Sequence, residues 1–215
     1  NKVDVAKKTA EMLLDWQFST DYPVIEGLTM EVSLKKNSKT VYEKAFPLFN
    51  HCSRQKIDLD NVDFWWPRGY GDPVLYDATV RLVNTKGNLL DERSHRVGIR
   101  TADLIHTDIT TPEKPGEFAF MINGEKVFIR GTNWVPLDAL HSRDKVHLDN
   151  AIQMVNDLNC NMVRCWGGNV YEDNDFFDLC DQNGIMVWQD FAMGCTTYPQ
   201  DPEFADQIRK EAISI

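Results

Sequence analysis

The stretch of sequence that most constrains the fold alternates three short apolar runs with two amphipathic segments. Glycines bound the apolar runs, and the segments between them repeat apolar residues at helical spacing. Short, continuously apolar strands separated by amphipathic helices predict parallel strands that are buried on both faces and joined by right-handed crossovers. The sequence therefore predicts an α/β region, with strands over residues 127–131, 161–166 and 184–191 and helices over residues 148–159 and 175–183.

Polar and aromatic residues recur where each of these predicted strands ends, which is where α/β sheets gather their chemistry. They are Asn133 and Trp134 after the first strand, Arg164, Trp166 and Gly167 at the second, and Asp190 on the third. Tryptophan faces stack on the apolar face of a pyranose, while amide, guanidinium and carboxylate groups bond its hydroxyls. Taken singly, each tryptophan is better explained as a residue of the hydrophobic core than as a sugar ligand. Arg164 is likewise better explained as a partner in an ion pair. Their combination at successive strand ends favours a sugar-binding site.

Asp190 is the one carboxylate at a predicted strand end. Glycoside hydrolysis needs two carboxylates, about 5 Å apart for retention or about 6.5–9.5 Å apart for inversion. The carboxylates nearest in sequence include Asp173 and Asp175, which have the position of helix N-terminal residues that the helix dipole favours. The sequence offers no convincing pair, so we assign no catalytic residue, and Asp190 is interpreted as a hydroxyl ligand or a structural carboxylate.

Residues 1 to about 105 have β character, with short runs that alternate apolar and polar residues and with turn residues between them. About seven short strands in roughly 100 residues are typical of an immunoglobulin-like sandwich, here without the Cys-Trp-Cys pattern of antibody domains. The loop over residues 65–73 is dense in aromatic and turn residues. Trp65 and Trp66 are interpreted as anchors of this loop, although an exposed aromatic loop could also hold a sugar.

Local signals predict several other boundaries. The polar, proline-containing stretch 102–117 is typical of an interdomain linker. Asn123-Gly124 predicts a hairpin, and Gly184 predicts the left-handed end of the second helix. Asp201-Pro202 predicts the start of a third helix, with Asp as the cap and Pro at the first helical position.

Length and composition narrow the class of protein. The 215 residues favour two domains, which we place at residues 1–105 and 106–215. The net charge of −10, without a Lys/Arg cluster, argues against nucleic-acid and anionic-membrane partners. No apolar run approaches the ~18 residues of a membrane span. The five cysteines lack metal-ligand spacing, and no glycine-rich phosphate loop follows a strand, so we expect neither a metal nor a nucleotide cofactor.

Three motifs in the α/β region resemble glycoside hydrolase family 2, and most of all its β-mannosidase branch. They are residues 131–136 (Gly-Thr-Asn-Trp-Val-Pro), 162–172 (Met-Val-Arg-Cys-Trp-Gly-Gly-Asn-Val-Tyr-Glu) and 184–191 (Gly-Ile-Met-Val-Trp-Gln-Asp-Phe). The resemblance covers most of the chain and is most specific between residues 118 and 200. One departure is Asn169, where many relatives have a third glycine.

The resemblance implies an exo-acting, retaining glycosidase with a (β/α)8 TIM barrel and no metal or organic cofactor. The family's acid/base Glu follows an Asn, and this chain has no Asn-Glu pair, so both catalytic Glu residues would lie outside it. We therefore expect a fragment that is itself inactive: a sandwich and the first three β/α units of a barrel. What carries over is the floor of a sugar subsite, formed by Asn133, Trp134, Arg164, Trp166 with Gly167, and Asp190.

Partners and alternatives follow from the same resemblance. It implies a carbohydrate substrate and an extracytoplasmic or periplasmic location, and an incomplete barrel would leave an unpaired edge through which copies could associate. Alternative activities in the family are those of β-galactosidase, β-glucuronidase and exo-β-glucosaminidase. An alternative from another class is a non-catalytic carbohydrate-binding module.

Overall fold

The computed structural model describes residues 2–21 and 24–215. The chain forms two compact units. The first comprises Asn1–Trp66 and Tyr70–Phe128, and the second comprises Pro67–Gly69 and Ile129–Ile215. Residues 67–69 therefore belong to the second unit, although sandwich residues flank them in the sequence.

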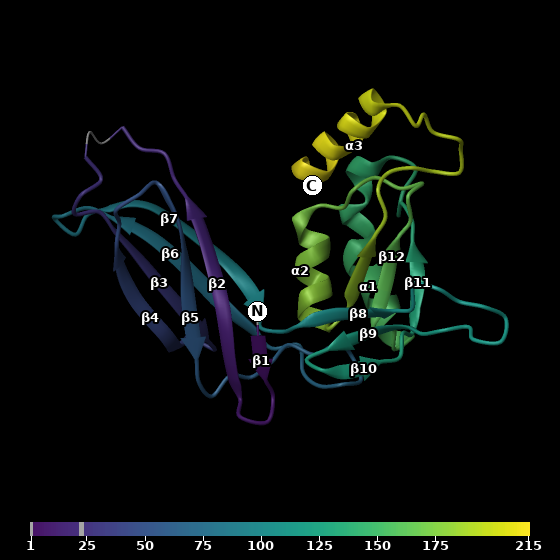
Figure 1. The fold of residues 1–215 in the computed structure, drawn as a ribbon, viewed down its shortest axis with the longest axis horizontal. Helices are drawn as coiled ribbons and strands as arrows, with labels where there is room; N and C mark the ends of the chain where they lie inside the picture. The colour runs from purple at the N-terminus through teal and green to yellow at the C-terminus, as the bar shows by residue number, and fades with distance from the viewer. Residues whose placement is uncertain (1, 22–23) are drawn as a thin grey trace. The chain divides into compact units, whose positions relative to one another are not determined.

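In the described part of the chain, residues 2–98 form a sandwich of two antiparallel sheets (Figure 1). Inward-facing side chains of both sheets share one apolar core, in which Met30, Val32 and Ile57 are buried. Two antiparallel sheets around one core confirm the predicted immunoglobulin-like sandwich. One sheet has the order β1 (Lys2–Asp4), β2 (Thr9–Gln17), β5 (Cys52–Leu59), and the other has the order β4 (Lys39–Pro47), β3 (Thr29–Lys36), β6 (Leu75–Val83), β7 (Leu89–Gly98).

The tight turn between β3 and β4 shows how local sequence sets the register of the sandwich. Lys36 pairs with Lys39, so the loop consists of Asn37 and Ser38. Both have positive φ, 48° and 65°, as a type I′ hairpin turn requires. The turn therefore consists of residues of the kind that separate the alternating runs in the sequence.

The aromatic loop after β5 is anchored in the sandwich by Trp65, as predicted. Trp65 is 2% exposed, and the guanidinium of Arg100 lies 4.8 Å from its ring centroid. Its carbonyl accepts a hydrogen bond of 3.0 Å from the side-chain amide of Asn123. A Cβ at Gly98 would come within 2.9 Å of the indole, so this glycine makes room for the ring. Trp66 is half-buried against the sandwich core.

The prediction of a linker over residues 102–117 is wrong for residues 102–106. Ala102–His106 forms β8, which pairs with β9 (Phe118–Ile122), and β9 pairs in turn with β10 (Glu125–Val127). The sequence pattern missed this strand because most of the surrounding residues are polar. Its two apolar residues lie opposite β9 residues that are distant in sequence, so the pairing is not visible in local sequence. The hairpin at Asn123-Gly124 is confirmed, and both turn residues have positive φ. These three strands group with the first unit, and the domain boundary at residue 105 stays a prediction.

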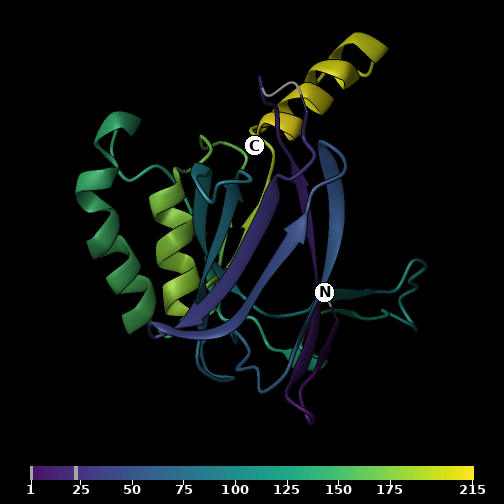
Figure 2. The same cartoon turned by 90° about the vertical axis from the view of Figure 1, so that its left-hand side faces the viewer.

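The second unit is an α/β layer with a parallel sheet, as the sequence predicted. Strands β11 (Gly131–Trp134), β12 (Met162–Cys165) and β13 (Met186–Gln189) are adjacent and parallel. Helices α1 (Lys145–Asp157) and α2 (Asn174–Asn183) lie side by side against one face of the sheet (Figures 1 and 2). Ile152, Phe176 and Val163 share a core there. A short 3₁₀ helix, η1 (His141–Arg143), precedes α1, and α3 is Pro202–Ser214.

The first parallel strand begins later than predicted. The sequence indicated residues 127–131, but Val127 belongs to β10 and pairs with Phe120. The tight Asn-Gly hairpin takes Val127 into β10, and β11 begins at Gly131, which pairs with Met162. A Cβ at Gly131 would lie 2.6 Å from the Met162 carbonyl oxygen, so the close approach of the two strands requires glycine.

The helix ends follow their predicted signals. Gly184 ends α2 in the left-handed region, with φ of 67°. Asp201 caps α3 by accepting a hydrogen bond of 2.8 Å from the backbone N–H of Phe204. Within residues 2–21 and 24–215, no helix combines the length and apolar character needed to cross a bilayer.

Candidate functional site

The parallel register separates the predicted site residues onto two faces of the sheet. Asn133 pairs with Arg164, and Trp134 pairs with Cys165. Successive side chains of a strand point to opposite faces. Trp134 and Cys165 pack with the helices, so Asn133 and Arg164 lie on the face that α1 and α2 leave uncovered.

On that uncovered face, Arg164 connects Asn133 and Asp190. Its Nη2 lies 2.5 Å from Asp190 Oδ2, its Nε lies 3.3 Å from Asp190 Oδ1, and its Nη1 lies 3.4 Å from Asn133 Oδ1. The backbone N–H of Gly167 donates to Asp190 Oδ2 at 3.3 Å. The structure thus joins Asn133 of β11, Arg164 of β12, Gly167 of the loop after β12 and Asp190, the residue after β13, into a single polar network.

Asp190 occupies its place through backbone pairing. Its N–H donates to the Cys165 carbonyl at 3.1 Å, which extends the contact between β12 and β13 by one residue. The two-pronged contact with the guanidinium engages both carboxylate oxygens. Because the Arg164 and Asp190 side chains remain 45% and 21% exposed, this charge-paired cluster stays accessible to a ligand. Both groups keep further hydrogen-bonding capacity.

The exposed aromatic rings beside this network are those of Trp166 and Trp188, which are 36% and 39% exposed. The Trp166 ring lies over Gly168, where a Cβ would come within 2.2 Å of it. Trp188 pairs with Arg164 and precedes Asp190 by two residues, so it shares their face. The sequence reasoning missed Trp188, although the period-two alternation from Asp190 would have pointed to it.

Trp134 has a different environment from the rest of the predicted set. It is 4% exposed, its ring centroid lies 4.9 Å from that of Phe176, and its indole N–H donates to Glu172 Oε1 at 2.9 Å. It therefore lies beneath the loop that follows β12 and not on the uncovered face. Sugar binding by the six predicted residues stays a prediction.

A second polar cluster, also missed from the sequence, lines a cavity of about 190 Å³ between the N-terminal ends of α1 and α2. His141 Nδ1 lies 2.8 Å from Oδ2 of the buried Asp144. This hydrogen bond, opposed by partial burial and assisted by the charges of Asp144 and Glu172, raises the pKa of His141. In residues 2–21 and 24–215, no group of three or more His, Cys, Asp or Glu side chains is arranged to hold a metal ion.

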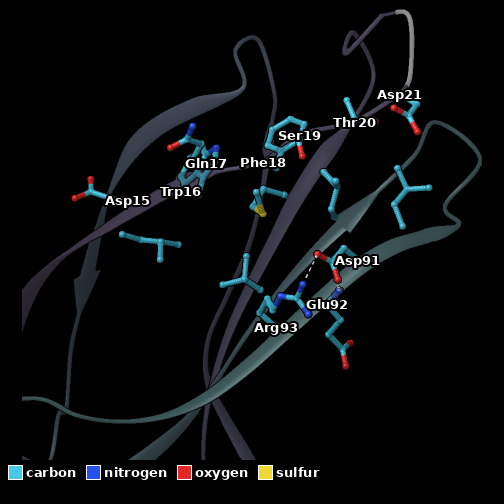
Figure 3. Close-up of a pocket in the computed structure, with 15 residues that line it drawn as sticks. Asp15, Trp16, Gln17, Phe18, Ser19, Thr20, Asp21, Asp91, Glu92 and Arg93 are labelled. Carbon is cyan, nitrogen blue, oxygen red and sulfur yellow. Dashed lines mark hydrogen bonds and ion pairs between the residues drawn. The ribbon is translucent and has the colours of Figure 1, made fainter. Parts of the chain in front are cut away.

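The sandwich carries a larger groove, about 720 Å³, on its flank between β2 and β7 (Figure 3). Asp91 and Arg93 lie opposite inward-facing residues of β6 and form an ion pair of 3.3 Å. Inward-pointing charges on an outer strand hinder pairing with another sheet. Among the described residues, the buried Nε1 of Trp16 has no hydrogen-bond partner. The groove contains none of the predicted site residues, and its apolar floor consists of Leu14, Met30, Val80, Leu82 and Leu90.

Comparisons with known proteins agree with this architecture. Residues 2–100 match the model of glycosyl hydrolases family 2. A β-D-mannosidase structure from Dictyoglomus thermophilum superposes with a TM-score of 0.76 at 31% identity, covering 95% of this chain and 25% of that one. A β-glucuronidase structure from Bifidobacterium dentium, at 19% identity, has a TM-score of 0.75 over 94% of this chain and 30% of that one, and so shares the fold.

The chain belongs to glycosyl hydrolases family 2. Within that family it is similar to the β-mannosidases. It is 42% identical over 154 residues to the enzyme of Capra hircus, covering 70% of this chain and 17% of the relative. It is 39% identical over 166 residues to β-mannosidase B of Aspergillus fumigatus, covering 76% of this chain and 19% of the relative. The chain therefore spans less than a fifth of the length of these relatives.

Proposed function

We propose that this chain supplies part of the sugar-binding site of an exo-acting, retaining β-glycosidase. The observation that carries the proposal is the network of Asn133, Arg164 and Asp190 at the carboxyl ends of parallel strands. In this reading the guanidinium and carboxylate bond the hydroxyls of a terminal sugar, and the exposed rings of Trp166 and Trp188 offer apolar surface to the pyranose.

We propose further that β11, β12 and β13 are the first three strands of a (β/α)8 barrel, within a domain over residues 106–215 that follows the sandwich domain over residues 1–105. Parallel strands, crossover helices on one face and functional groups at the carboxyl ends support this. In such a barrel the uncovered face of the sheet would point inward. The test is an experimental structure of the longer protein of which this chain is proposed to be a part. Finding β11 or β13 at an open sheet edge in that structure would contradict the proposal.

The chemistry of the network favours a neutral hexose, and we propose a terminal β-mannoside. Arg164 is already paired with Asp190, so its charge is largely compensated and less suited to a uronic acid carboxylate. The similarity to β-mannosidases supports the same choice. Assays of the longer protein with aryl β-mannoside, β-galactoside, β-glucuronide and β-glucosaminide test it. Preference for any sugar other than mannose would refute the assignment.

This chain by itself is proposed to be inactive. Retaining hydrolysis needs two carboxylates about 5 Å apart, and Asp190, the one at the network, is engaged by a guanidinium. The outer strands β11 and β13 would also let copies of the chain associate through an edge. Turnover of an aryl β-mannoside by the 215-residue chain would contradict the first statement. A monomer in light scattering at all concentrations would contradict the second.

The decisive experiment removes the carboxylate charge. In the longer protein, Asp190→Asn keeps the shape of the side chain and weakens its bonds to Arg164 and to the sugar. Loss of a hydrogen bond to a charged group amounts to about 1.5–3 kcal/mol, so kcat/KM should fall about tenfold or more. The matched control is Asp206→Asn on α3, an exposed carboxylate that pairs with Lys210. Equal kcat/KM values for the two variants would refute the proposed site.

The groove on the sandwich favours a second candidate function, carbohydrate binding by the sandwich itself. It combines apolar floor residues, the rings of Trp16 and Phe18 and an accessible ion pair, which are the components of a sugar pocket. Titration of the chain with mannose oligosaccharides, repeated with Trp16→Phe, tests this candidate. Unchanged protein NMR spectra throughout the titration would exclude it.

A further inference from the structure

Trp134 holds both ends of the loop that connects β12 to α2. At the start of the loop, its carbonyl accepts a hydrogen bond of 3.3 Å from the N–H of Trp166. At the end of the loop, its indole N–H donates to the carboxylate of Glu172 at 2.9 Å. One residue at the end of β11 thus bonds to residues 166 and 172, which the loop separates along the chain.

The middle of the loop is tied to the same carboxylate. Asn169 donates from its side-chain amide to Glu172 Oε1 at 3.3 Å and accepts from the N–H of Val170 at 2.8 Å. Asn169 and Trp134 are 8% and 4% exposed. Hydrogen bonds to an ionised acceptor in such shielded surroundings are stronger than neutral ones at a surface. The ring of Phe176 supports the indole from below.

The opposite side of the loop faces the polar network. Gly167 donates its N–H to Asp190, and a Cβ there would lie 2.6 Å from the Met193 carbonyl oxygen. The neighbouring Trp166 ring covers Gly168. This side of the loop is packed tightly against the chain that follows β13. A shift of the Glu172 end would therefore be transmitted to Trp166 and to the Gly167 contact with Asp190.

We propose that Trp134, Asn169 and Glu172 are positioning residues for the sugar site. They hold the loop from behind, so that Trp166 and the Gly167 N–H keep their places beside Arg164 and Asp190, and they do not touch the sugar. The proposal rests on the proposed glycosidase function. A positioning role agrees better with the burial of Trp134 than stacking on a sugar would.

The test uses Trp134→Phe in the longer protein. Phenylalanine keeps an aromatic ring against Phe176 and removes only the donor to Glu172. We expect KM for aryl β-mannoside to rise about tenfold, the worth of one hydrogen bond to a charged group, with a much smaller change in kcat. Glu172→Ala should raise KM in the same way, and Glu172→Gln, which keeps an acceptor oxygen, should recover most of the loss.

Gln153→Ala is the matched control, because it also removes a side-chain donor to a carboxylate, the bond of 2.8 Å to Asp157 on the exposed side of α1. It should leave KM unchanged. In a double-mutant cycle, Trp134→Phe combined with Glu172→Ala should raise KM no more than either change alone. Additive effects, or a wild-type KM in Trp134→Phe, would overturn the proposal while leaving the glycosidase assignment intact.

Hydrogen exchange separates this proposal from the function on which it rests. Amides of residues 166–172 should exchange at least several-fold faster in Trp134→Phe than in Gln153→Ala. If the wild-type protein hydrolyses no glycoside, the glycosidase proposal fails, and the exchange rates still judge whether the three residues hold the loop. Identical exchange of this loop in both variants would overturn the positioning role.

Discussion

Gly167 is enclosed by main-chain atoms, which makes Gly167→Ala an informative perturbation of the site. A Cβ at this position would lie 2.6 Å from the Met193 carbonyl oxygen and 2.7 Å from that of Phe191. Ordinary carbon–oxygen contacts are about 3.3 Å or longer, so the two segments would have to separate by about 0.6–0.7 Å. Neither neighbour is the end of a flexible side chain, so the strain cannot be relieved by a rotamer change.

Overpacking of this kind costs about 1–3 kcal/mol, and we expect the upper half of that range because both obstacles are backbone. The matched control is Gly194→Ala, whose Cβ would meet its nearest neighbour at 3.8 Å, an ordinary van der Waals distance. That control should change the free energy of unfolding by no more than about 0.5 kcal/mol.

The assay is urea unfolding followed by tryptophan fluorescence, to which Trp134, Trp166 and Trp188 of the second unit contribute. Because the chain has two units, the transition of the second must be fitted separately. We expect Gly167→Ala to lower the midpoint at an unchanged slope, since the same surface is exposed on unfolding. A midpoint equal to that of Gly194→Ala would show that the segment with Phe191 and Met193 can move away from the added Cβ at little cost in free energy. That result would refute the tight packing inferred for this loop.

Three further predictions concern titration, reactivity and capping. Asp144 raises the pKa of His141, so the pair stabilises the fold fully below the unfolded value of about 6.5, and this stabilisation is lost as the pH rises through the folded pKa. An NMR titration should show Asp144→Asn lowering that pKa, and an unmoved midpoint would contradict the pairing. A thiol reagent should label the exposed Cys52 and Cys195 in the native chain, with labelling of any third cysteine before unfolding counting against the structure. Asp201→Ala should destabilise α3 by about 1 kcal/mol, seen as faster amide exchange at its first turn, and unchanged exchange there would argue against the cap.

Much of the fold was readable in local chemistry. The period-two runs of the first hundred residues, the Asn-Gly turn, the left-handed Gly184 and the Asp201-Pro202 cap each act over a few residues, so their signals survive without tertiary context. The parallel order of three strands also followed from sequence, because apolar strands joined by amphipathic helices leave few other arrangements.

Local patterns failed where pairing over long sequence distances decided the outcome. Residues 102–106 resemble a linker in sequence and form a strand because they pair with Phe120 and its neighbours. The strand β11 begins at Gly131 because the preceding hairpin takes Val127. Strand propensity depends on such partners more than helix propensity does.

The candidate site divides in the same way. Sequence alone identified Asn133, Arg164, Gly167 and Asp190 as residues of strand ends, because parallel strands bring their carboxyl ends to one edge of a sheet. Only the tertiary structure decided which face each side chain takes. A shift of one residue in register inverts the two faces, so the burial of Trp134 beneath the loop and the exposure of Trp188 beside Arg164 depend on where β11 begins and how it pairs with β12.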